Sequence, residues 1–178
     1  MKIWKKISSK KVHNNPRFSV FEDVVLLPDG SRGKFYYRKS SPGVGVIAFD
    51  GKKIYLVNQY RYGVKRRLWE APIGRAESKN YLAQAKKELR EETGITAKKW
   101  QFLGEFFPTP GSGNARGILF FAQNLKLGKP NREASESDMF MKSFTVKQID
   151  TMINKGLIQD SWTITALYFF KLKCTELL

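Results

Sequence analysis

Three glutamates lie within five positions of one another in this chain. Glu88, Glu91 and Glu92 belong to the run KELREETG at residues 87–94. In a helix, positions three and four residues apart are neighbours, so the three carboxylates fall on adjoining parts of one face. Like charges at that spacing repel, and carboxylates near the end of a helix oppose its dipole. A cation would offset both penalties, and Mg²⁺ prefers such oxygen ligands.

The same triplet also has a purely structural interpretation. Glutamate-rich helix ends are commonly solvated, and Lys86, Lys87 and Arg90 can neutralise much of the charge. Taken alone, the triplet favours that solvated face. The residues on either side therefore decide whether a metal site is predicted.

Those flanking residues resemble the signature of the Nudix hydrolases. The signature runs glycine, five residues, glutamate, seven residues, then Arg-Glu-aliphatic-any-Glu-Glu-any-Gly-aliphatic. Its second half matches residues 88–95, with Lys87 in the arginine position. In the first half, Lys79 stands where a glutamate is expected, and the spacing from Gly74 is one residue short. Glu77 can replace that glutamate if the loop is remodelled.

Further segments resemble the ADP-ribose pyrophosphatase branch of that family. NQYRY at residues 58–62 and LWEAPIG at residues 68–74 resemble its "QYR" and "WE-x-P-x-G" runs. VVLLPDG at 24–30 and TPG at 109–111 resemble an earlier strand and turn and a later loop. Ala115 departs from the branch, which commonly has a glutamate at that position.

The resemblance implies a metal-binding role for four residues. Glu88 and Glu92 are the leading ligands, with Glu91 supporting or sharing that role, and the backbone carbonyl of Ile73 adds a further oxygen. The implied cofactor is Mg²⁺, with Mn²⁺ as the alternative. These ions would bridge the oxygens of a diphosphate and orient an attacking water.

The substrate contacts and the general base follow the same resemblance. Arg61 is the expected phosphate contact, because a guanidinium pairs bidentately with phosphate oxygens. Glu70 either contacts substrate or a metal-bound water, or forms a structural salt bridge. The best-aligned base is Glu136, in the acidic segment at residues 132–138.

Several rivals for the base stay open. Glu133 and Asp138 lie in the same acidic segment as the aligned glutamate. Glu88 or Glu91 can also serve, as in other branches of the family.

Composition narrows the class of protein. A chain of 178 residues fits one domain, residues 1–178, in which N-terminal strands at 1–39 precede a catalytic core at 40–178. No apolar run approaches the roughly 18 residues of a membrane span. The N-terminus lacks the apolar core of a signal peptide. One cysteine and one histidine exclude an internal disulfide, a histidine-based metal site and a Ser-His-Asp triad, and favour the cytoplasm.

The formal net charge of +16 admits more than one explanation. A basic protein attracts polyanions such as nucleic acid. The lysines are scattered along the sequence, however, so solubility and steering of phosphorylated small molecules are favoured over dedicated nucleic-acid binding.

The pattern of apolar residues predicts an α/β protein with the Nudix fold, a mixed β-sheet sandwich flanked by helices. A helix should run from an N-cap at Asn80 to Thr93 and stop at Gly94. Further helices are expected at Val146–Asn154 and at Thr163–Leu172, the latter with Ile164, Leu167, Tyr168 and Leu172 in the core. Strands are expected at Phe18–Leu27, Lys34–Lys39, Val44–Phe49, Ile54–Tyr60, Phe102–Phe107 and Ile118–Asn124.

The leading prediction is a Mg²⁺-dependent pyrophosphatase that cleaves ADP-ribose or a related nucleoside diphosphate sugar. The alternatives are a catalytically weak Nudix fold that binds RNA or nucleotides, and an enzyme for dinucleoside polyphosphates or oxidised nucleotides. The resemblance also implies a homodimer built through the N-terminal strands.

Overall fold

The structure is a computed structural model that describes residues 3–177. The chain divides into two compact units. One unit contains the residues up to Pro42 together with residues 107–116, and the other contains residues 43–106 and the chain from Gly117 onward. Whether the two units act as one domain stays a prediction.

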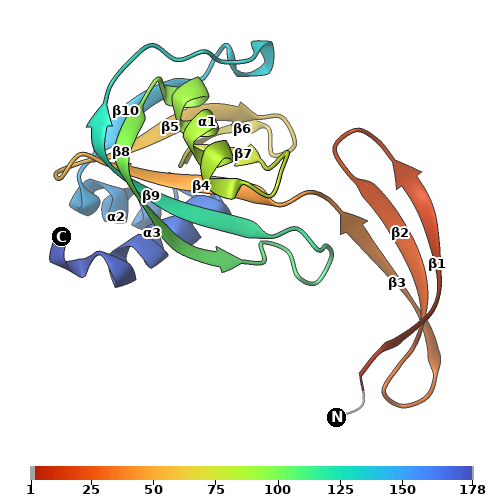
Figure 1. Ribbon diagram of the computed structural model, residues 1–178. Coiled ribbons are helices and arrows are strands. Elements are labelled where there is room, and N and C mark those ends of the chain that lie inside the picture. The colour runs from red at the N-terminus through yellow and green to blue at the C-terminus, as the bar shows by residue number, and fades with distance from the viewer. Residues whose placement is uncertain (1–2, 178) are drawn as a thin grey trace. The chain divides into compact units, whose positions relative to one another are not determined.

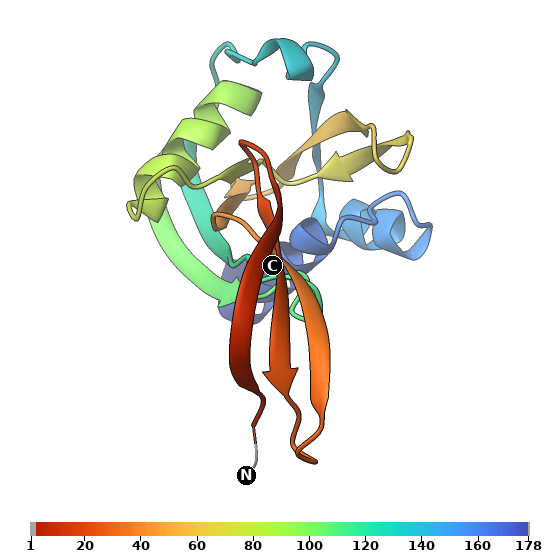
Figure 2. The same cartoon turned by 90° about the vertical axis from the view of Figure 1, so that its right-hand side faces the viewer.

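The first unit is an antiparallel sheet, in which the described residues form three strands in the order β1-β2-β3 (Figure 2). The strands are β1 (Lys5–Asn14), β2 (Ser19–Leu26) and β3 (Arg32–Lys39). Aromatic side chains hold neighbouring strands together: the rings of Phe21 and Tyr37 stack with centroids 5.6 Å apart. The predicted turn after β2 is present, with Gly30 at a φ of 92° that favours glycine.

The second unit is built on a mixed sheet, to which the described residues contribute seven strands. The strands are β4 (Gly43–Phe49), β5 (Ile54–Arg61), β6 (Arg66–Glu70), β7 (Ile73–Arg75), β8 (Thr96–Phe106), β9 (Gly117–Lys126) and β10 (Phe140–Phe144). The main path runs β10-β5-β4-β9-β8, with β6 paired to β5 and β7 paired to β4. The β4–β9 pair is parallel, whereas the other pairs are antiparallel.

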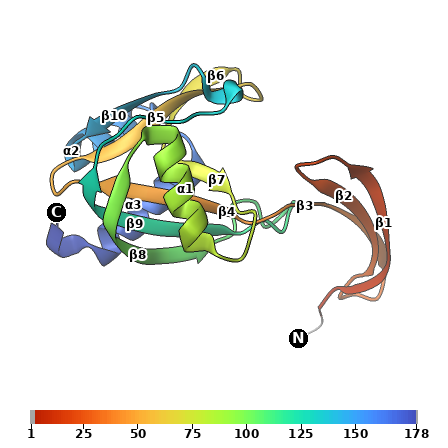
Figure 3. The same ribbon diagram turned by 45° about the horizontal axis from the view of Figure 1, so that its top comes forward.

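Helices cover both faces of this sheet (Figures 1 and 3). The helices are α1 (Tyr81–Thr93), α2 (Val146–Asn154) and α3 (Ser161–Lys173). Successive residues of a strand point to opposite faces. In β4, Val46 and Ala48 pack toward Leu89 of α1, while Ile47 and Phe49 pack in the cluster that contains α2 and α3. The predicted α/β class with flanking helices is confirmed.

The helices match their predicted bounds closely, but the prediction for the face of α3 is wrong. Leu167 is buried as expected, whereas Ile164, Tyr168 and Leu172 are 38%, 63% and 59% exposed. The buried positions are Thr163, Ala166, Leu167 and Phe170, and of these only Leu167 was expected. Since apolar residues surround this helix on all sides, periodicity alone could not identify the buried face.

The predicted strands are all present, but several strands were missed. β8 begins at Thr96, six residues before its predicted start, because its solvated first half carries lysines. The short strands β6, β7 and β10 have no alternation long enough to distinguish them from loops. None of the helices in residues 3–177 has the length and apolar character needed to cross a membrane.

Candidate active site

Helix α1 presents the three glutamates near its C-terminal end. Asn80 begins the helix, and its side-chain oxygen accepts a hydrogen bond from the Ala83 amide at 3.1 Å. Gly94 ends it in the left-handed conformation, with φ of 75°. A side chain at Gly94 would also collide with the Gly128 carbonyl, so both the conformation and the close approach require glycine. Both predicted caps are confirmed.

The Glu88 carboxylate lies directly against the backbone of Gly74. A Cβ atom added at Gly74 would overlap that carboxylate, so only glycine leaves room for it. Gln84, one helical turn before Glu88, donates a hydrogen bond from Nε2 to Oε1 of Glu88 at 2.7 Å. The glycine of the sequence motif therefore positions a carboxylate of the same motif.

Glu92, in the second unit, is a buried acidic residue with a carboxylate oxygen that is unpartnered within residues 3–177. Its side chain is 4% exposed, and among the described residues its Oε2 has no hydrogen-bond partner. Burial raises the pKa of the Glu92 carboxyl well above its usual range, and the negative charges of Glu136 and Glu88 raise it further. An unpaired buried carboxylate is costly, so the site favours either a proton or a cation there.

Glu88 lies in a similar but less extreme environment. Burial raises the pKa of its carboxyl, and the charges of Glu91 and Glu136 raise it further, against the hydrogen bond from Gln84 and the charge of Lys87. Glu91 is half-buried. Glu136, 44 positions after Glu92 in the sequence, is thus within electrostatic reach of both Glu88 and Glu92.

The loop at residues 127–139 carries Glu136 past the end of α1 (Figure 2). Arg132 fastens the loop to the helix: its Nε donates to the Glu92 carbonyl at 2.8 Å, and its Nη1 donates to the Met139 carbonyl at 2.6 Å. The Asn131 amide adds a bond to the Glu91 carbonyl at 2.9 Å. The main-chain oxygens of Glu91 and Glu92 thus hold the loop that contains Glu136.

The two rivals of Glu136 are placed differently. Asp138 forms an ion pair with Arg67, with Oδ2 2.5 Å from Nη1. Glu133 is exposed and lies at the start of the short 3₁₀ helix Ala134–Glu136. Neither residue is among the charges that raise the pKa of Glu88 or Glu92. Of the three candidates, Glu136 is therefore the one whose charge acts on the glutamates of α1, and its role as the base stays a prediction.

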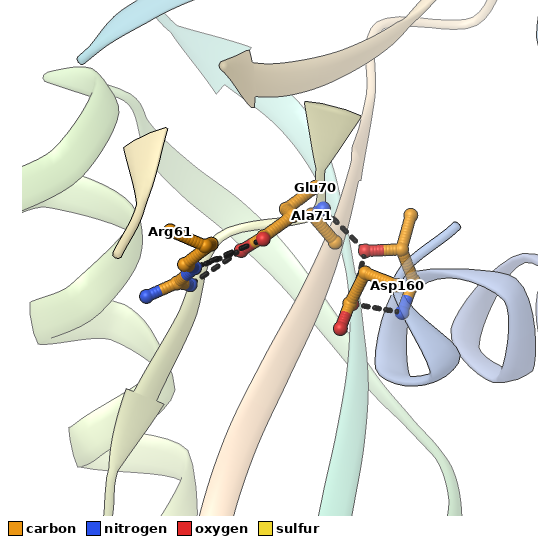
Figure 4. A network of polar contacts seen from close by, with 5 residues as sticks. Arg61, Glu70, Ala71 and Asp160 are labelled. Carbon is orange, nitrogen blue, oxygen red and sulfur yellow. Dashed lines mark hydrogen bonds and ion pairs between the residues drawn. The ribbon is translucent and has the colours of Figure 1, made fainter. Parts of the chain in front are cut away.

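Arg61 and Glu70 form a salt bridge (Figure 4). Nε of Arg61 donates to both carboxylate oxygens of Glu70, at 2.9 and 3.1 Å, and Nη2 donates to Oε2 as well. Glu70 is only 2% exposed, while the Arg61 side chain is 43% exposed. The positive charge of Arg61 opposes the rise in the pKa of Glu92, so the pair lies within electrostatic reach of the acidic cluster.

This salt bridge is one of the two alternatives foreseen for Glu70. The next residue along the chain, Ala71, is also held firmly. Its amide donates to Oγ1 of Thr163 at 2.9 Å, and that hydroxyl donates to Asp160, the N-cap of α3, at 2.8 Å. The end of β6, which carries Glu70, is thus anchored to the N-terminus of α3 (Figure 4).

The remaining motif residues lie around the same helix. Ile73, half-buried in β7, pairs with Gly45 and immediately precedes Gly74, against which the Glu88 carboxylate packs. Glu77 pairs with Lys87 at 3.4 Å, which ties the shortened loop to α1. Lys79 is exposed.

The residues present fit a hard divalent cation by their chemistry. The carboxylates of Glu88 and Glu92, the second with a buried oxygen that lacks a partner in the described chain, are donors of the kind that Mg²⁺ prefers. Across residues 3–177, no three acidic, histidine or cysteine side chains surround a common point at ligand spacing. Further oxygens must therefore come from the backbone, water or substrate phosphates, as is usual for Mg²⁺.

Sequence reasoning missed two residues that support the site. Gln84 could have been found, because it is four positions before Glu88 on a predicted helix. Arg132 could not, because its partners are main-chain oxygens as much as 40 positions away in the sequence. No side-chain pattern records such a contact.

Comparisons with known proteins agree with this architecture. Residues 39–165 match the NUDIX domain, and residues 4–37 match the nucleoside diphosphate sugar hydrolase N-terminal domain. An ADP-ribose pyrophosphatase of Mycobacterium tuberculosis (strain ATCC 25618 / H37Rv) is 31% identical over 166 residues, covering 90% of this chain and 80% of that protein. An ADP-ribose pyrophosphatase of Bacillus subtilis (strain 168) is 28% identical over 174 residues, covering 95% and 93%.

A solved structure confirms the predicted fold. The crystal structure of an ADP compounds hydrolase superposes with a TM-score of 0.84, covering 97% of this chain and 95% of that one. The two sequences are 15% identical, so this likeness concerns the fold alone.

Proposed function

Because this chain belongs to the Nudix hydrolase family and is an enzyme of that class, we propose that it hydrolyses the diphosphate bond of ADP-ribose or a related nucleoside diphosphate sugar. The products would be a nucleoside monophosphate and a sugar phosphate. The two ADP-ribose pyrophosphatases among its relatives, and the match to a nucleoside diphosphate sugar hydrolase domain, support this substrate class.

The observation that carries the proposal is the buried Glu92 carboxylate. It lies beside Glu88 and within the field of Glu136, and its Oε2 has no partner in the described part of the chain. A structural glutamate would be expected to pair with a cationic side chain or to reach solvent. A site for Mg²⁺, with Mn²⁺ as the alternative, explains why neither occurs.

In this proposal Glu88 and Glu92 hold the cation, with Glu91 and the Ile73 carbonyl completing the protein ligands. Bound Mg²⁺ would neutralise the charge of the diphosphate and orient the substrate. Glu136 accepts a proton from the attacking water. The water oxygen then bonds to phosphorus as the P–O anhydride bond breaks, and the leaving phosphate oxygen retains the electron pair.

Arg61 is the residue proposed to contact the diphosphate. Glu70 occupies its Nε and Nη2, and within residues 3–177 its Nη1 has no protein partner. Glu70 thereby fixes the guanidinium plane before substrate arrives, which lowers the entropic cost of binding. In this proposal Glu70 is a positioning residue.

We also propose that the chain forms a homodimer through its N-terminal sheet. All ten residues of β1 are exposed, including the apolar Ile7 and Val12, and β1 is an edge strand of its sheet. An exposed edge with apolar residues is available to pair with a second chain.

A substrate panel tests the activity. ADP-ribose, other nucleoside diphosphate sugars, dinucleoside polyphosphates and oxidised nucleotides are each incubated with Mg²⁺ and with Mn²⁺, and the products are identified by mass spectrometry. Preferential release of AMP and ribose 5-phosphate from ADP-ribose is expected. Preferential cleavage of dinucleoside polyphosphates or oxidised nucleotides would show that the substrate class is wrong.

A further inference from the structure

Helix α1 has a second charged face that the catalytic proposal does not use. Ala83, Lys86, Lys87 and Arg90 follow one another at intervals of three, one and three residues, which places them on one side of the helix. Lys86 and Glu88 are two positions apart, so their side chains leave the helix in nearly opposite directions. One helix therefore offers carboxylates to the catalytic cluster and cations to a different surface.

This basic face lines a hollow of about 330 Å³ between α1 and the edge strand β8. The lining residues are Ala83, Lys86, Lys87, Arg90, Thr96, Ala97 and Trp100. Trp100 is half-buried, and its Nε1 donates to the Ala97 carbonyl at 3.1 Å, which fixes the ring. The Nζ of Lys86 lies 5.9 Å from the centre of that ring. The hollow thus combines an oriented aromatic ring with three cationic side chains.

A second hollow, of about 340 Å³, also borders on Trp100. Its other lining residues are Lys99, Gln101, Phe121 and Gln123. Strand register places this second hollow on the other face of the sheet. Lys99 pairs with Gln123 and Gln101 pairs with Phe121, which packs in the cluster of α2 and α3, whereas the Trp100 ring packs in the cluster of α1. The second hollow is therefore separate from the basic one. Among the cations of the first hollow, Lys87 is partly neutralised by Glu77, whereas no ion pair involves Lys86 or Arg90 among the described residues.

We propose that the hollow between α1 and β8, with Trp100 in its wall, is a binding surface for single-stranded nucleic acid. Lysine and arginine side chains would contact successive phosphates, and Trp100 would stack on a base. Lys86 and Arg90 are one helical turn apart, about 6 Å along the axis, so they can contact different phosphates of one strand. The formal net charge of +16 adds a long-range attraction for a polyanion. The proposal does not depend on the hydrolytic function, because Lys86, Arg90 and Trp100 have no role in the proposed reaction.

The expected binding is measured with a fluorescein-labelled 12-nucleotide RNA of mixed sequence, by fluorescence anisotropy at several salt concentrations. The affinity of the wild-type protein should fall as salt rises. The double variant Lys86→Gln/Arg90→Gln should bind about tenfold more weakly or worse. Its salt slope should be smaller by about 1.4, because each phosphate contact on a single strand contributes about 0.7.

A matched control separates a site from bulk charge. Lys147→Gln/Lys155→Gln removes the same charge from exposed positions at or next to α2, outside both hollows. This control should keep the wild-type affinity within about twofold. Equal losses in the two double variants would overturn the proposal, as would absence of wild-type binding at about 50 mM salt, where the electrostatic attraction is strong.

The stacking contribution has its own test. Trp100→Leu keeps apolar bulk but removes the aromatic face, so affinity should fall about fivefold or more. Trp100→Phe keeps a ring and should retain most of the affinity, which protects the test if the leucine variant folds poorly. Binding of duplex RNA as tightly as the single strand, or displacement of the RNA by equally low concentrations of AMP, would contradict the proposed surface.

Discussion

At the scale of single residues, the proposed activity depends on a carboxylate placed where a carboxylate is unfavourable. Glu92 is buried, lacks a partner for Oε2 within the described residues and lies among other negative charges. Natural proteins rarely retain such a group unless it binds a ligand or takes part in a reaction. The raised pKa has a measurable consequence for stability.

In metal-free buffer, the free energy of unfolding should fall as pH rises above about 4.5, the ordinary value for glutamate. The sign follows because the folded protein holds the Glu92 proton above the pH at which the unfolded chain releases it. Each pH unit in that interval lowers the free energy of unfolding by about 1.4 kcal/mol. Urea unfolding across the pH range measures this slope. Glu92→Gln should flatten it, and an unchanged slope in that variant would assign the effect to other groups.

Added Mg²⁺ should reverse the direction of this trend. Metal binding needs deprotonated carboxylates and stabilises only the folded state, so stability in saturating Mg²⁺ should rise with pH in the same window. Melting temperatures measured with and without metal at each pH provide the comparison. A Glu92→Gln protein that is stabilised by Mg²⁺ as strongly as the wild type would contradict the assigned ligand.

Gly74→Ala should impair catalysis by displacing Glu88. The added Cβ overlaps the Glu88 carboxylate, and a shift of about 1 Å at a reacting centre can cost about 100-fold in rate. The value of kcat/KM and the apparent affinity for Mg²⁺ should both fall. Gly63→Ala is the control, since a Cβ there meets nothing within 4 Å. Similar losses in both variants would refute the steric explanation.

Much of the site could be predicted residue by residue, because α1 places the glutamates by its own periodicity. The Glu88–Gly94 half of the motif and the helix caps are local in sequence, whereas the packing of Glu88 against Gly74, 14 positions away, was not foreseen. A salt bridge of Glu70 was foreseen as one of two roles, but its partner Arg61 was not. Arg132 was missed, because a side chain that binds distant carbonyls leaves no pattern.

At the scale of elements, the loop at residues 127–139 is joined to α1 by the side chain of Arg132. Its guanidinium bridges the Glu92 carbonyl of α1 and the Met139 carbonyl at the end of the loop. Arg132→Met should therefore loosen the position of Glu136 and lower kcat about 10- to 100-fold. The pH dependence should keep its shape, because the titrating groups remain.

Lys129→Met on the same loop is the matched control for this variant. Lys129 is exposed, so its loss should leave kcat unchanged. A comparable effect of the two substitutions on kcat would show that the loop responds to charge rather than to the bridge. A loss seen only in KM would place Arg132 in substrate binding instead.

The elements were predictable where apolar residues recur at a clear period, and length alone did not suffice, since the exposed ten-residue β1 had no predicted bounds. Helices α1 and α2 and the buried strands β4 and β5 have clear patterns and were placed within a residue or so of their bounds. The short strands β6 and β7, which present Glu70 and Ile73, have too few residues to show alternation. The buried face of α3 was misassigned because its apolar residues surround the helix.

At the scale of the whole molecule, the sequence could not show how the scattered lysines are distributed in space. The structure places Lys86, Lys87 and Arg90 in one hollow with Trp100, so part of the charge of +16 gathers beside one aromatic ring. The boundary between the two family matches, at residues 37–39, lies near the end of the first unit.

The proposed homodimer is tested by light scattering coupled to gel filtration. The expected mass is twice the 20.5 kDa of one chain. Ile7 is 49% exposed in β1, so Ile7→Glu should shift the protein toward monomer without unfolding it. Tyr168→Glu, at an exposed position of α3, should leave the mass unchanged. A wild-type monomer, or a dimer broken only by the α3 variant, would contradict the assigned surface.

The most direct test of the proposed activity is the turnover of ADP-ribose in Mg²⁺ by the wild-type protein and by Glu92→Gln. The products are then identified. The wild type should release AMP and ribose 5-phosphate, and a chelator should abolish the reaction. The variant should lose at least about 100-fold in kcat/KM, because an interaction worth several kcal/mol is removed. Full activity in Glu92→Gln, or no turnover by the wild type with either metal, would contradict the proposed metal-dependent hydrolysis.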